Sequence, residues 1–308
     1  MNNFFDWHVH LTGSIPVKYW SNILSQRNQL GGRTIDNLKS QLYIENSSAW
    51  SELKVCTDTE EGFRDTVIFV VEDMLNRGVR GANFIFNPHS LINRGLDISK
   101  TFENLHPFLQ HLIDEGQFYP LFRMGVNRRD GLEELEKIAK LFKQNKDKYL
   151  WLEAIDINGD EQKYSLKPFI SQLLELNKES IPYTIHAGEG FELTASLEHA
   201  IKCSPIRIGH GVASVFDDSL IKEIKEKKIA LELCVSSNLE TFNIPLEEYP
   251  LVKLFDTGVD IVLGSDNPSF INSNIEDEYS LVSSVLGDQP LESVGSVTER
   301  YLRRSKLI

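Results

Sequence analysis

Residues 206–235, IRIGHGVASVFDDSLIKEIKEKKIALELCV, contain the unit on which the fold prediction rests. The short apolar runs Ile206–Gly209 and Ile229–Val235 predict two strands, and the amphipathic segment Asp217–Lys227 between them predicts a helix. Both runs are nearly continuously apolar, which is typical of parallel strands buried on both faces. This stretch therefore predicts a strand, a covering helix and a second strand parallel to the first.

The same alternation extends through the rest of the chain. Six further strands are expected, at Phe4–Leu11, Ala82–Asn87, Tyr119–Val126, Leu150–Ile157, Pro182–Ala187 and Val259–Gly264. Eight strands separated by helices such as Gly131–Phe142 predict an α/β fold, a (β/α)8 TIM barrel. An open doubly wound sheet is the alternative, but no GxGxxG or GxxxxGK[ST] phosphate loop follows the first strand.

The segment between the first two strands, residues 13–81, is unusually long. It contains the polar stretch SQRNQLGGRTIDNLKS (residues 25–40) and a predicted helix near Thr59–Asn76. Long ordered connections are usually lids or binding elements, so we expect an insertion after strand 1 that covers the barrel mouth. The sequence has no repeat, low-complexity tract or linker, and residues 1–308 are expected to form a single domain.

Composition excludes several classes of protein. With 41% hydrophobic and 25% charged residues, the chain is typical of a globular protein. Its 32 Lys and Arg against 45 Asp and Glu give a net charge of −13, which disfavours a nucleic-acid partner but not a small phosphorylated ligand. The longest apolar run, Val67 to Val71, is too short to span a membrane. Three cysteines without a CxxC pair suggest reduced thiols and a cytoplasmic protein.

Candidate metal ligands gather at the ends of the predicted strands. His8 and His10 are two residues apart at the end of the first strand, so their side chains point to the same side. His186, His210 and Asp266 end strands five, six and eight. In a barrel these ends meet at one face, where four of the five residues could hold a divalent ion and leave one position for water. An HxH pair alone is also compatible with a structural role.

Six segments resemble the adenosine deaminase family of metal-dependent amidohydrolases in order and spacing. Between residues 6 and 268 they are DWHVHLTGSI, IDINGDE, TIHAGEG, RIGHG, LELCVSSNLET and GVDIVLGSDNP. The resemblance implies a (β/α)8 barrel with one zinc ion (Zn2+) per chain. It implies zinc-dependent hydrolytic deamination of an adenine nucleoside or its 5′-monophosphate to the hypoxanthine product and ammonia. The candidate substrates are adenosine, deoxyadenosine, AMP and dAMP. The protein would then be a hydrolase acting on a C–N bond.

The resemblance also implies a role for each site residue. The metal ligands are His8, His10, His186 and Asp266, and the catalytic residues are Glu189, His210 and Asp266. Glu189 matches the proton donor to the purine ring, His210 the residue that takes a proton from the attacking water, and Gly159 the glycine that contacts the purine edge. The chemistry is consistent, because zinc lowers the pKa of water towards ~7 and because C6 of adenine is a poor electrophile until N1 is protonated. An alternative for Glu189 is a carboxylate that only interacts with a helix dipole.

Departures from the family pattern bear on the substrate. Thr12 stands where nucleoside-specific members have an acidic residue, so a 5′-phosphate would meet no negative charge there. The alternative is that Thr12 hydrogen-bonds a nucleoside 5′-hydroxyl. Asn267 replaces a second aspartate and can donate its amide hydrogen to purine N7. Candidate phosphate-binding cations lie in or beside the insertion, at Lys18, Arg27, Arg33 and Arg64. The segment ANFIFNPHS in strand two lacks acidic and Arg residues that are common in the family.

Two other functions remain open from the sequence. A metal-dependent phosphoesterase can also begin with HxH, but it needs bridging carboxylates or a modified Lys, and LWLEAIDIN ends without one. A catalytically inactive nucleotide-binding relative is disfavoured because every ligand and both acid–base residues are present. The expected partner is a small-molecule purine nucleoside or nucleotide, with no nucleic acid and no membrane, and homo-oligomer formation is left open. Ser236, Ser237 and Asn238 are expected to support the site.

Overall fold

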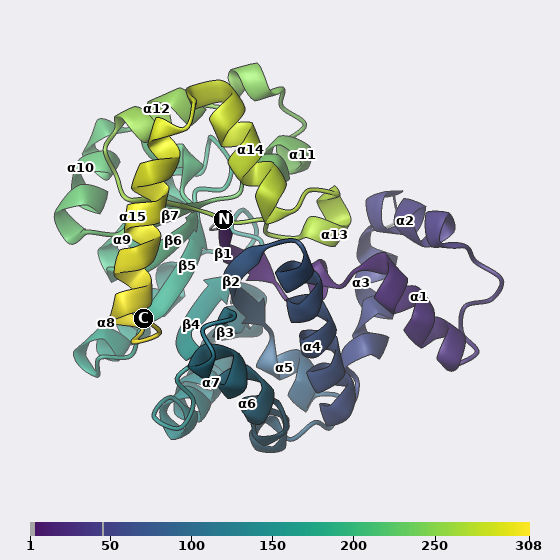
Figure 1. Cartoon of the computed structure of the whole chain (residues 1–308). Coiled ribbons are helices and arrows are strands. Elements are labelled where there is room, and N and C mark those ends of the chain that lie inside the picture. Colours follow the sequence, from purple (N-terminus) through teal and green to yellow (C-terminus); the bar gives the residue numbers. More distant parts are fainter. Residues whose placement is uncertain (1–3, 45) are drawn as a thin grey trace.

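The computed structural model describes residues 4–44 and 46–308, and its centre is a sheet of eight parallel strands. Each strand pairs with the next along the chain. The barrel closes where β1 meets the residues that follow β8: His10 N donates to Asp266 O at 2.8 Å, and Asp266 N donates to His8 O at 2.7 Å. The strands are β1 (Phe4–His10), β2 (Val79–Phe86), β3 (Tyr119–Asn127), β4 (Leu152–Asn158), β5 (Tyr183–Ala187), β6 (Arg207–His210), β7 (Ala230–Leu233) and β8 (Ile261–Leu263). The predicted (β/α)8 barrel is confirmed (Figure 1).

Helices surround the barrel and cover the outer faces of its strands (Figure 1). They include α4 (Glu60–Asn76), α6 (Ile98–Asp114), α7 (Gly131–Asn145), α8 (Ile170–Lys178), α9 (Thr194–Cys203), α10 (Asp218–Lys227), α12 (Leu251–Asp256), α14 (Ile275–Leu286) and α15 (Gln289–Arg304). The apolar stripe of α7 buries Leu135, Ile138 and Phe142 in the main core cluster. These helices form because their apolar residues recur every three or four positions and are buried against the strands.

The predicted boundaries differ from the observed ones by a few residues. Thr59 and Asp217, expected inside helices, are instead N-caps whose side chains accept from Gly62 N and Ser219 N. Strand β7 ends at Leu233 rather than Val235, because α11 (Val235–Phe242) begins directly after it. Capping and strand ends depend on local hydrogen bonds that apolar patterning does not encode.

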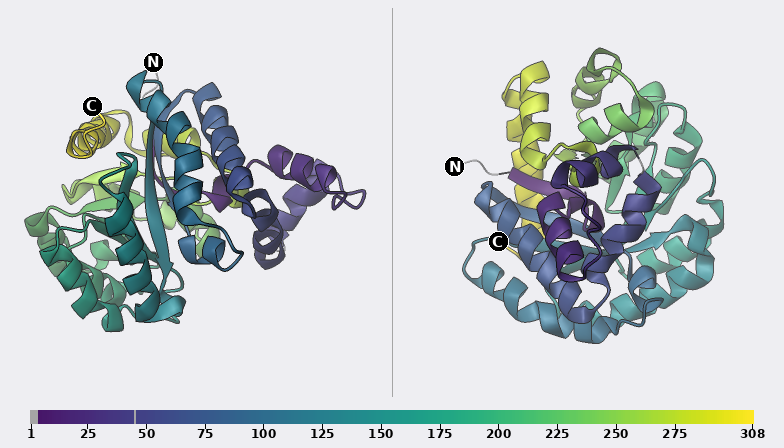
Figure 2. Two further views of the ribbon diagram at one scale, coloured as in Figure 1. Left: turned by 90° about the horizontal axis from the view of Figure 1, so that it is seen from below. Right: turned by 90° about the vertical axis from the view of Figure 1, so that its right-hand side faces the viewer.

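The long segment after β1 forms an insertion at one end of the barrel. It contains α1 (Val17–Gln26), α2 (Ile35–Ile44) and α3 (Asn46–Leu53), which project from the barrel in Figure 1 and lie in front of it in the right-hand view of Figure 2. The insertion has its own apolar cluster, including Trp20, Leu38 and Leu53. Phe270 of α13 (Pro268–Ile271) joins this cluster and stacks on Trp50 with ring centroids 4.4 Å apart. The insertion is thereby attached to the segment that follows β8.

No helix among the described residues combines the length and the hydropathy that crossing a bilayer requires.

Candidate active site

The predicted metal ligands lie together at the C-terminal ends of the strands. Strand β1 contributes His8 and His10, β5 contributes His186, β6 contributes His210, and Asp266 follows β8. The ligand atoms of His8, His186 and His210 lie within 4.8 Å of one another, as do those of His8, His10 and Asp266. The barrel closure brings the first and last of these strands side by side, so residues 258 positions apart in the chain (266 − 8) share one site.

The distances within this cluster fit a divalent metal ion. His10 Nε2 lies 3.3 Å from His186 Nε2 and 3.3 Å from Asp266 Oδ1, and His8 Nε2 lies 3.8 Å from Asp266 Oδ1. Ligands about 2.0–2.2 Å from a tetrahedral zinc ion are separated from each other by about 3.4 Å. His8 Nε2 is buried and has no hydrogen-bond partner within the described part of the chain, as expected for an atom whose partner is a metal.

Two buried carboxylates orient the ligand rings. Glu232 Oε2 of β7 lies 2.6 Å from His8 Nδ1, and Asp156 Oδ1 of β4 lies 3.1 Å from His186 Nδ1. A carboxylate on Nδ1 favours the tautomer whose Nε2 carries the free lone pair. Burial lowers the pKa of His8 to about 3 and that of His10 to about 4. His8 and His10 are therefore neutral at pH 7, which is the form that binds metals, whereas the Asp156 carboxylate raises the pKa of His186.

A layer of buried charged side chains, not predicted from the sequence, lies beneath these ligands. Glu232 accepts from Arg207 Nε at 2.6 Å and from Arg123 at 3.0 Å, and Arg123 also lies 3.4 Å from Asp156 Oδ2. All four side chains are buried. The signal for them was present, because a charged residue inside an otherwise apolar strand, such as Glu232 in ALEL, must point to a partner in the barrel interior.

The residues that end β6 and follow β8 have unusual backbone conformations. His210 has φ +66° and Asp266 has φ +59°, a region that non-glycine residues seldom adopt and that is frequent at functional sites. Ser237 Oγ donates to Asp266 Oδ2 at 2.5 Å. Asn238 Nδ2 lies 3.3 Å from His210 Nδ1. Ser237 and Asn238 thus contact the site residues, whereas Ser236 contacts Glu278 and Ser273 instead.

Glu189 lies in the connection from β5 to α9 and faces the same cavity. Its Oε1 is 3.9 Å from His210 Nε2. Burial raises the pKa of Glu189, so its carboxyl group keeps a proton at a higher pH than an exposed glutamate does. A carboxyl group with a raised pKa beside an imidazole is an arrangement suited to a proton donor and a proton acceptor with separate tasks.

A cavity of about 640 Å³ opens over the metal-ligand cluster. A site of this size accommodates a purine with its sugar. The predicted substrate residues Thr12, Gly159 and Asn267 all line it, as do Trp50 and Lys54 of the insertion. The insertion therefore forms part of the wall of the candidate active site.

Gly159 and Asn267 are constrained by their neighbours. Gly159 has φ +98°, and a Cβ there would lie 2.6 Å from Asn127 Oδ1, so only glycine fits. Asn267 Nδ2 donates to Asp266 Oδ1 at 2.8 Å. An amide group has two N–H donors, so one remains for a ligand.

The cations around the cavity differ from those suggested by the sequence. Arg27, Arg33 and Arg64 pair with Asp58, Glu52 and Asp65 respectively. The cavity is lined by Lys54, Arg94 and Arg129. Charge alone does not indicate which way a long side chain in an irregular insertion points.

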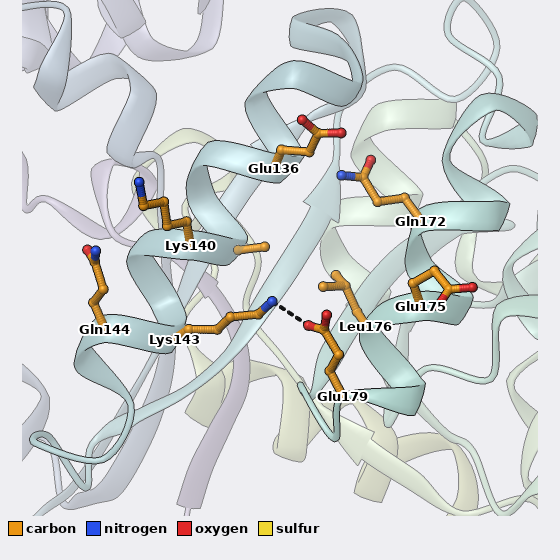
Figure 3. A pocket seen from close by; sticks show the side chains of 9 residues that line it. Glu136, Lys140, Lys143, Gln144, Gln172, Glu175, Leu176 and Glu179 are labelled. Atoms are coloured by element: carbon orange, nitrogen blue, oxygen red, sulfur yellow. Dashed lines mark ion pairs between the residues drawn. The ribbon is translucent and has the colours of Figure 1, made fainter.

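A second hollow, of about 360 Å³, lies on the outer surface between α7 and α8 (Figure 3). Its side chains carry both charges, and Lys143 forms an ion pair with Glu179 across it. The metal-ligand cluster and the cavity above it lie elsewhere, so this hollow has no part in the candidate chemistry.

The fold and the site define the class of protein as a (β/α)8 barrel of the metal-dependent amidohydrolase type. The family model described as adenosine deaminase matches residues 5–292. The chain therefore belongs to the adenosine deaminase family, whose members are hydrolases acting on C–N bonds.

Individual relatives differ in substrate. The chain is 27% identical over 235 residues to the aminodeoxyfutalosine deaminase of Streptomyces coelicolor, an alignment that covers 74% of this chain but only 59% of that protein. It is 27% identical over 297 residues to the adenosine deaminase of Haemophilus ducreyi, covering 90% of this chain and 84% of the relative. The structure of the N6-methyl-AMP deaminase of Arabidopsis thaliana superposes with a TM-score of 0.80 at 20% identity, covering 99% and 92% of the two chains, which supports the fold.

Proposed function

We propose that this protein is a zinc-dependent hydrolase that deaminates the C6 position of an adenine nucleoside or its 5′-monophosphate. The observation that carries the proposal is the cluster of His8, His10, His186 and Asp266 at one end of the barrel, with Glu189 and His210 facing the same cavity. The products are the corresponding hypoxanthine compound and ammonia.

The reaction needs an activated water and a protonated purine. Zinc held by the four ligands would lower the pKa of a water molecule towards ~7. His210, next to the ligand cluster, accepts a proton from the attacking water, and Asp266 lies beside both. Glu189 donates a proton to N1, so that C6 becomes electrophilic. The proton that His210 takes from water passes to the amine, which leaves as ammonia, and the remaining proton of the attacking water returns to Glu189 as the C6 carbonyl forms.

Substrate recognition follows from the residues on the cavity wall. The backbone of Gly159 is proposed to contact the purine edge, and the second N–H of the Asn267 amide to donate to N7. Because the reacting C6 must lie near the metal ligands, the N9 substituent on the opposite side of the purine faces the mouth formed by the insertion. A phosphomonoester there would meet Thr12, which carries no charge, and the cations Lys54 and Arg94.

Arg94 suits this role because, among the residues that the structure describes, its hydrogen bonds go to carbonyl and hydroxyl oxygens and none goes to a carboxylate. It donates to the carbonyl oxygens of Ser90 and Lys54 at 2.9 and 2.8 Å. Lys54 is exposed. A phosphate therefore gains two positive neighbours without breaking an existing ion pair of Arg94.

The test is mass spectrometry of the zinc-loaded protein incubated with adenine, adenosine, deoxyadenosine, AMP, dAMP, ATP and aminodeoxyfutalosine. We expect a mass increase of about 1 Da, from loss of NH and gain of O, in a nucleoside or monophosphate. Release of phosphate without that change would favour a phosphoesterase. No change in any substrate would favour an inactive relative.

A further inference from the structure

We infer that Glu161 is a positioning residue for Glu189, an inference that rests on the deamination proposed above. Glu161 lies in the loop that follows β4, two residues after Gly159. Its two carboxylate oxygens accept hydrogen bonds from two consecutive backbone N–H groups: Glu189 N donates to Oε1 at 2.8 Å, and Gly188 N donates to Oε2 at 2.9 Å.

The segment that carries Glu189 lies outside regular secondary structure, and Glu161 is the acceptor for two of its consecutive N–H groups. Strand β5 ends at Ala187 and α9 begins at Thr194, so the intervening residues take part in neither element. Gly188 is buried and has φ +67°. The carbonyl oxygen of Glu189 accepts from Asn238 Nδ2 at 3.4 Å. The carbonyl oxygen of Gly188 accepts from Ala213 N at 3.0 Å. The peptide group that joins Gly188 to Glu189 is thus held by Glu161 at its N–H and by Ala213 at its carbonyl oxygen, and Asn238 contacts the next carbonyl oxygen.

A carboxylate is the side chain best suited to this arrangement. Two neighbouring N–H groups need two acceptors, and the two carboxylate oxygens of Glu161 supply both, with hydrogen bonds that are stronger than those to a neutral acceptor. A glutamine could accept only one of them and would direct its own NH2 group at the other. Left without an acceptor, a buried N–H group is costly, so the segment would shift.

The same loop links substrate recognition to the proton donor. Gly159 lines the cavity and Glu161 holds the backbone of Glu189. A substrate that fits against Gly159 therefore meets Glu189 at a fixed distance. Displacement of a reacting group by about 1 Å can lower the rate by about 10²-fold. A shift of this loop should therefore lower kcat.

The first experiment compares the wild-type enzyme with Glu161→Gln. We expect kcat to fall by about 10²-fold, while KM and the zinc content per chain stay close to the wild-type values. Asp97→Asn is the matched control, because Asp97 Oδ1 accepts from Ser99 N and Lys100 N at the start of α6, outside the site. A Glu161→Gln enzyme with wild-type kcat would overturn the inference.

The second experiment asks whether Glu161 acts through Glu189. In a double-mutant cycle, Glu161→Gln should lower kcat almost no further in a Glu189→Gln background. The glutamine at position 189 cannot transfer a proton, so its exact position no longer matters for the rate. Multiplicative losses would mean that Glu161 has only a general structural role, and would contradict the inference.

A third measurement does not depend on turnover. Hydrogen exchange followed by mass spectrometry should be faster in residues 188–193 of Glu161→Gln than in the wild type, since one of the two amide hydrogens loses its acceptor and the segment shifts. If Glu161→Gln does not fold, Glu161→Asp keeps the charge but shortens the reach, and should give the same changes at smaller size. Unchanged exchange and kcat in Glu161→Asp would then overturn the inference.

These outcomes separate the inference from the proposed function. A wild-type enzyme that releases no ammonia refutes the proposed function. A wild-type enzyme that is active, with an inactive Glu189→Gln variant and a fully active Glu161→Gln variant, refutes only the role of Glu161.

Discussion

At the residue scale, His8 shows how neighbours define a metal ligand. Its position two residues before His10 at the end of a strand was predictable, because alternate residues of a strand face the same side. Its partner Glu232 lies 224 positions away in the chain, and no local pattern connects the two. The sequence therefore predicted the candidate ligands, but not the carboxylates Glu232 and Asp156 that orient them.

Thr12→Asp tests the expected tolerance of a 5′-phosphate. Two negative charges about 4 Å apart repel by on the order of 4 kcal/mol at an effective dielectric constant of about 20, before screening by salt. The variant should lose kcat/KM for AMP or dAMP by at least about 10-fold more than for the nucleoside, measured by ammonia release. Equal losses for both substrates would contradict a phosphate beside Thr12.

Lys54→Ala tests the same phosphate contact by removing a positive charge instead of adding a negative one. The side chain is exposed, so folding should not change. We expect kcat/KM for the monophosphate to fall by about 3- to 10-fold, and more at low salt, with the nucleoside unaffected. Lys222→Ala is the control, because Lys222 on α10 is exposed and lies away from the cavity wall. A monophosphate rate that is independent of Lys54 would remove this cation from the proposal.

At the scale of elements, the junction of β8 with β1 decides the position of the first metal ligands. A Cβ on Gly264 would lie 2.4 Å from His8 Cβ, and one on Gly209 would lie 2.7 Å from His8 Cε1. The apolar run Val259–Gly264 predicted a strand here, yet the reason for a glycine at its end is visible only once the barrel is closed. Likewise, the length of the insertion predicted a cover for the barrel mouth, but not which of its cations face the cavity.

Gly264→Ala should therefore disturb both stability and metal binding. Forcing a methyl group into this contact should lower the free energy of unfolding by about 1–3 kcal/mol, because overpacked sites relax only at a cost. It should also weaken zinc binding by displacing His8. The measurements are urea denaturation of the metal-free protein and competition with a chelator.

Gly295→Ala is the control for that variant. Gly295 lies in α15, and a Cβ there meets no atom within 4 Å. Because alanine favours helix more than glycine, this variant should gain up to about 1 kcal/mol and bind zinc normally. If Gly264→Ala behaved like Gly295→Ala, the close approach of β8 to His8 would not matter.

At the scale of the whole molecule, the barrel strands pack apolar side chains against the surrounding helices and carry buried charged side chains in the barrel interior. Arg123 of β3 reaches Glu232 of β7 and Asp156 of β4, and Arg207 of β6 reaches Glu232 and Glu153. These buried ion pairs connect strands across the barrel directly beneath the metal ligands. The apolar runs predicted the eight strands. A charged residue inside such a run indicates a buried partner, but which residue pairs with which depends on closure of the barrel and could not be read from the pattern.

Arg123→Met should destabilise the whole barrel. Removing one partner of a buried ion pair leaves uncompensated carboxylates, which typically costs about 3–5 kcal/mol. Chemical denaturation of the metal-free protein measures the loss, and Arg300→Met is the control, since Arg300 forms a partly exposed pair with Asp260. An Arg123→Met variant as stable as Arg300→Met would show that the interior charges contribute little to the fold.

The central claim, that one metal ion held by His8, His10, His186 and Asp266 supports deamination, is tested most directly by titrating zinc into the chelator-stripped enzyme and measuring ammonia release. The account predicts that activity is absent at the start, rises in proportion to added zinc and saturates at one zinc per chain. His186→Ala, which lacks a ligand, should stay inactive throughout the titration. Full activity in the stripped enzyme, or saturation only at two zinc ions per chain, would contradict it.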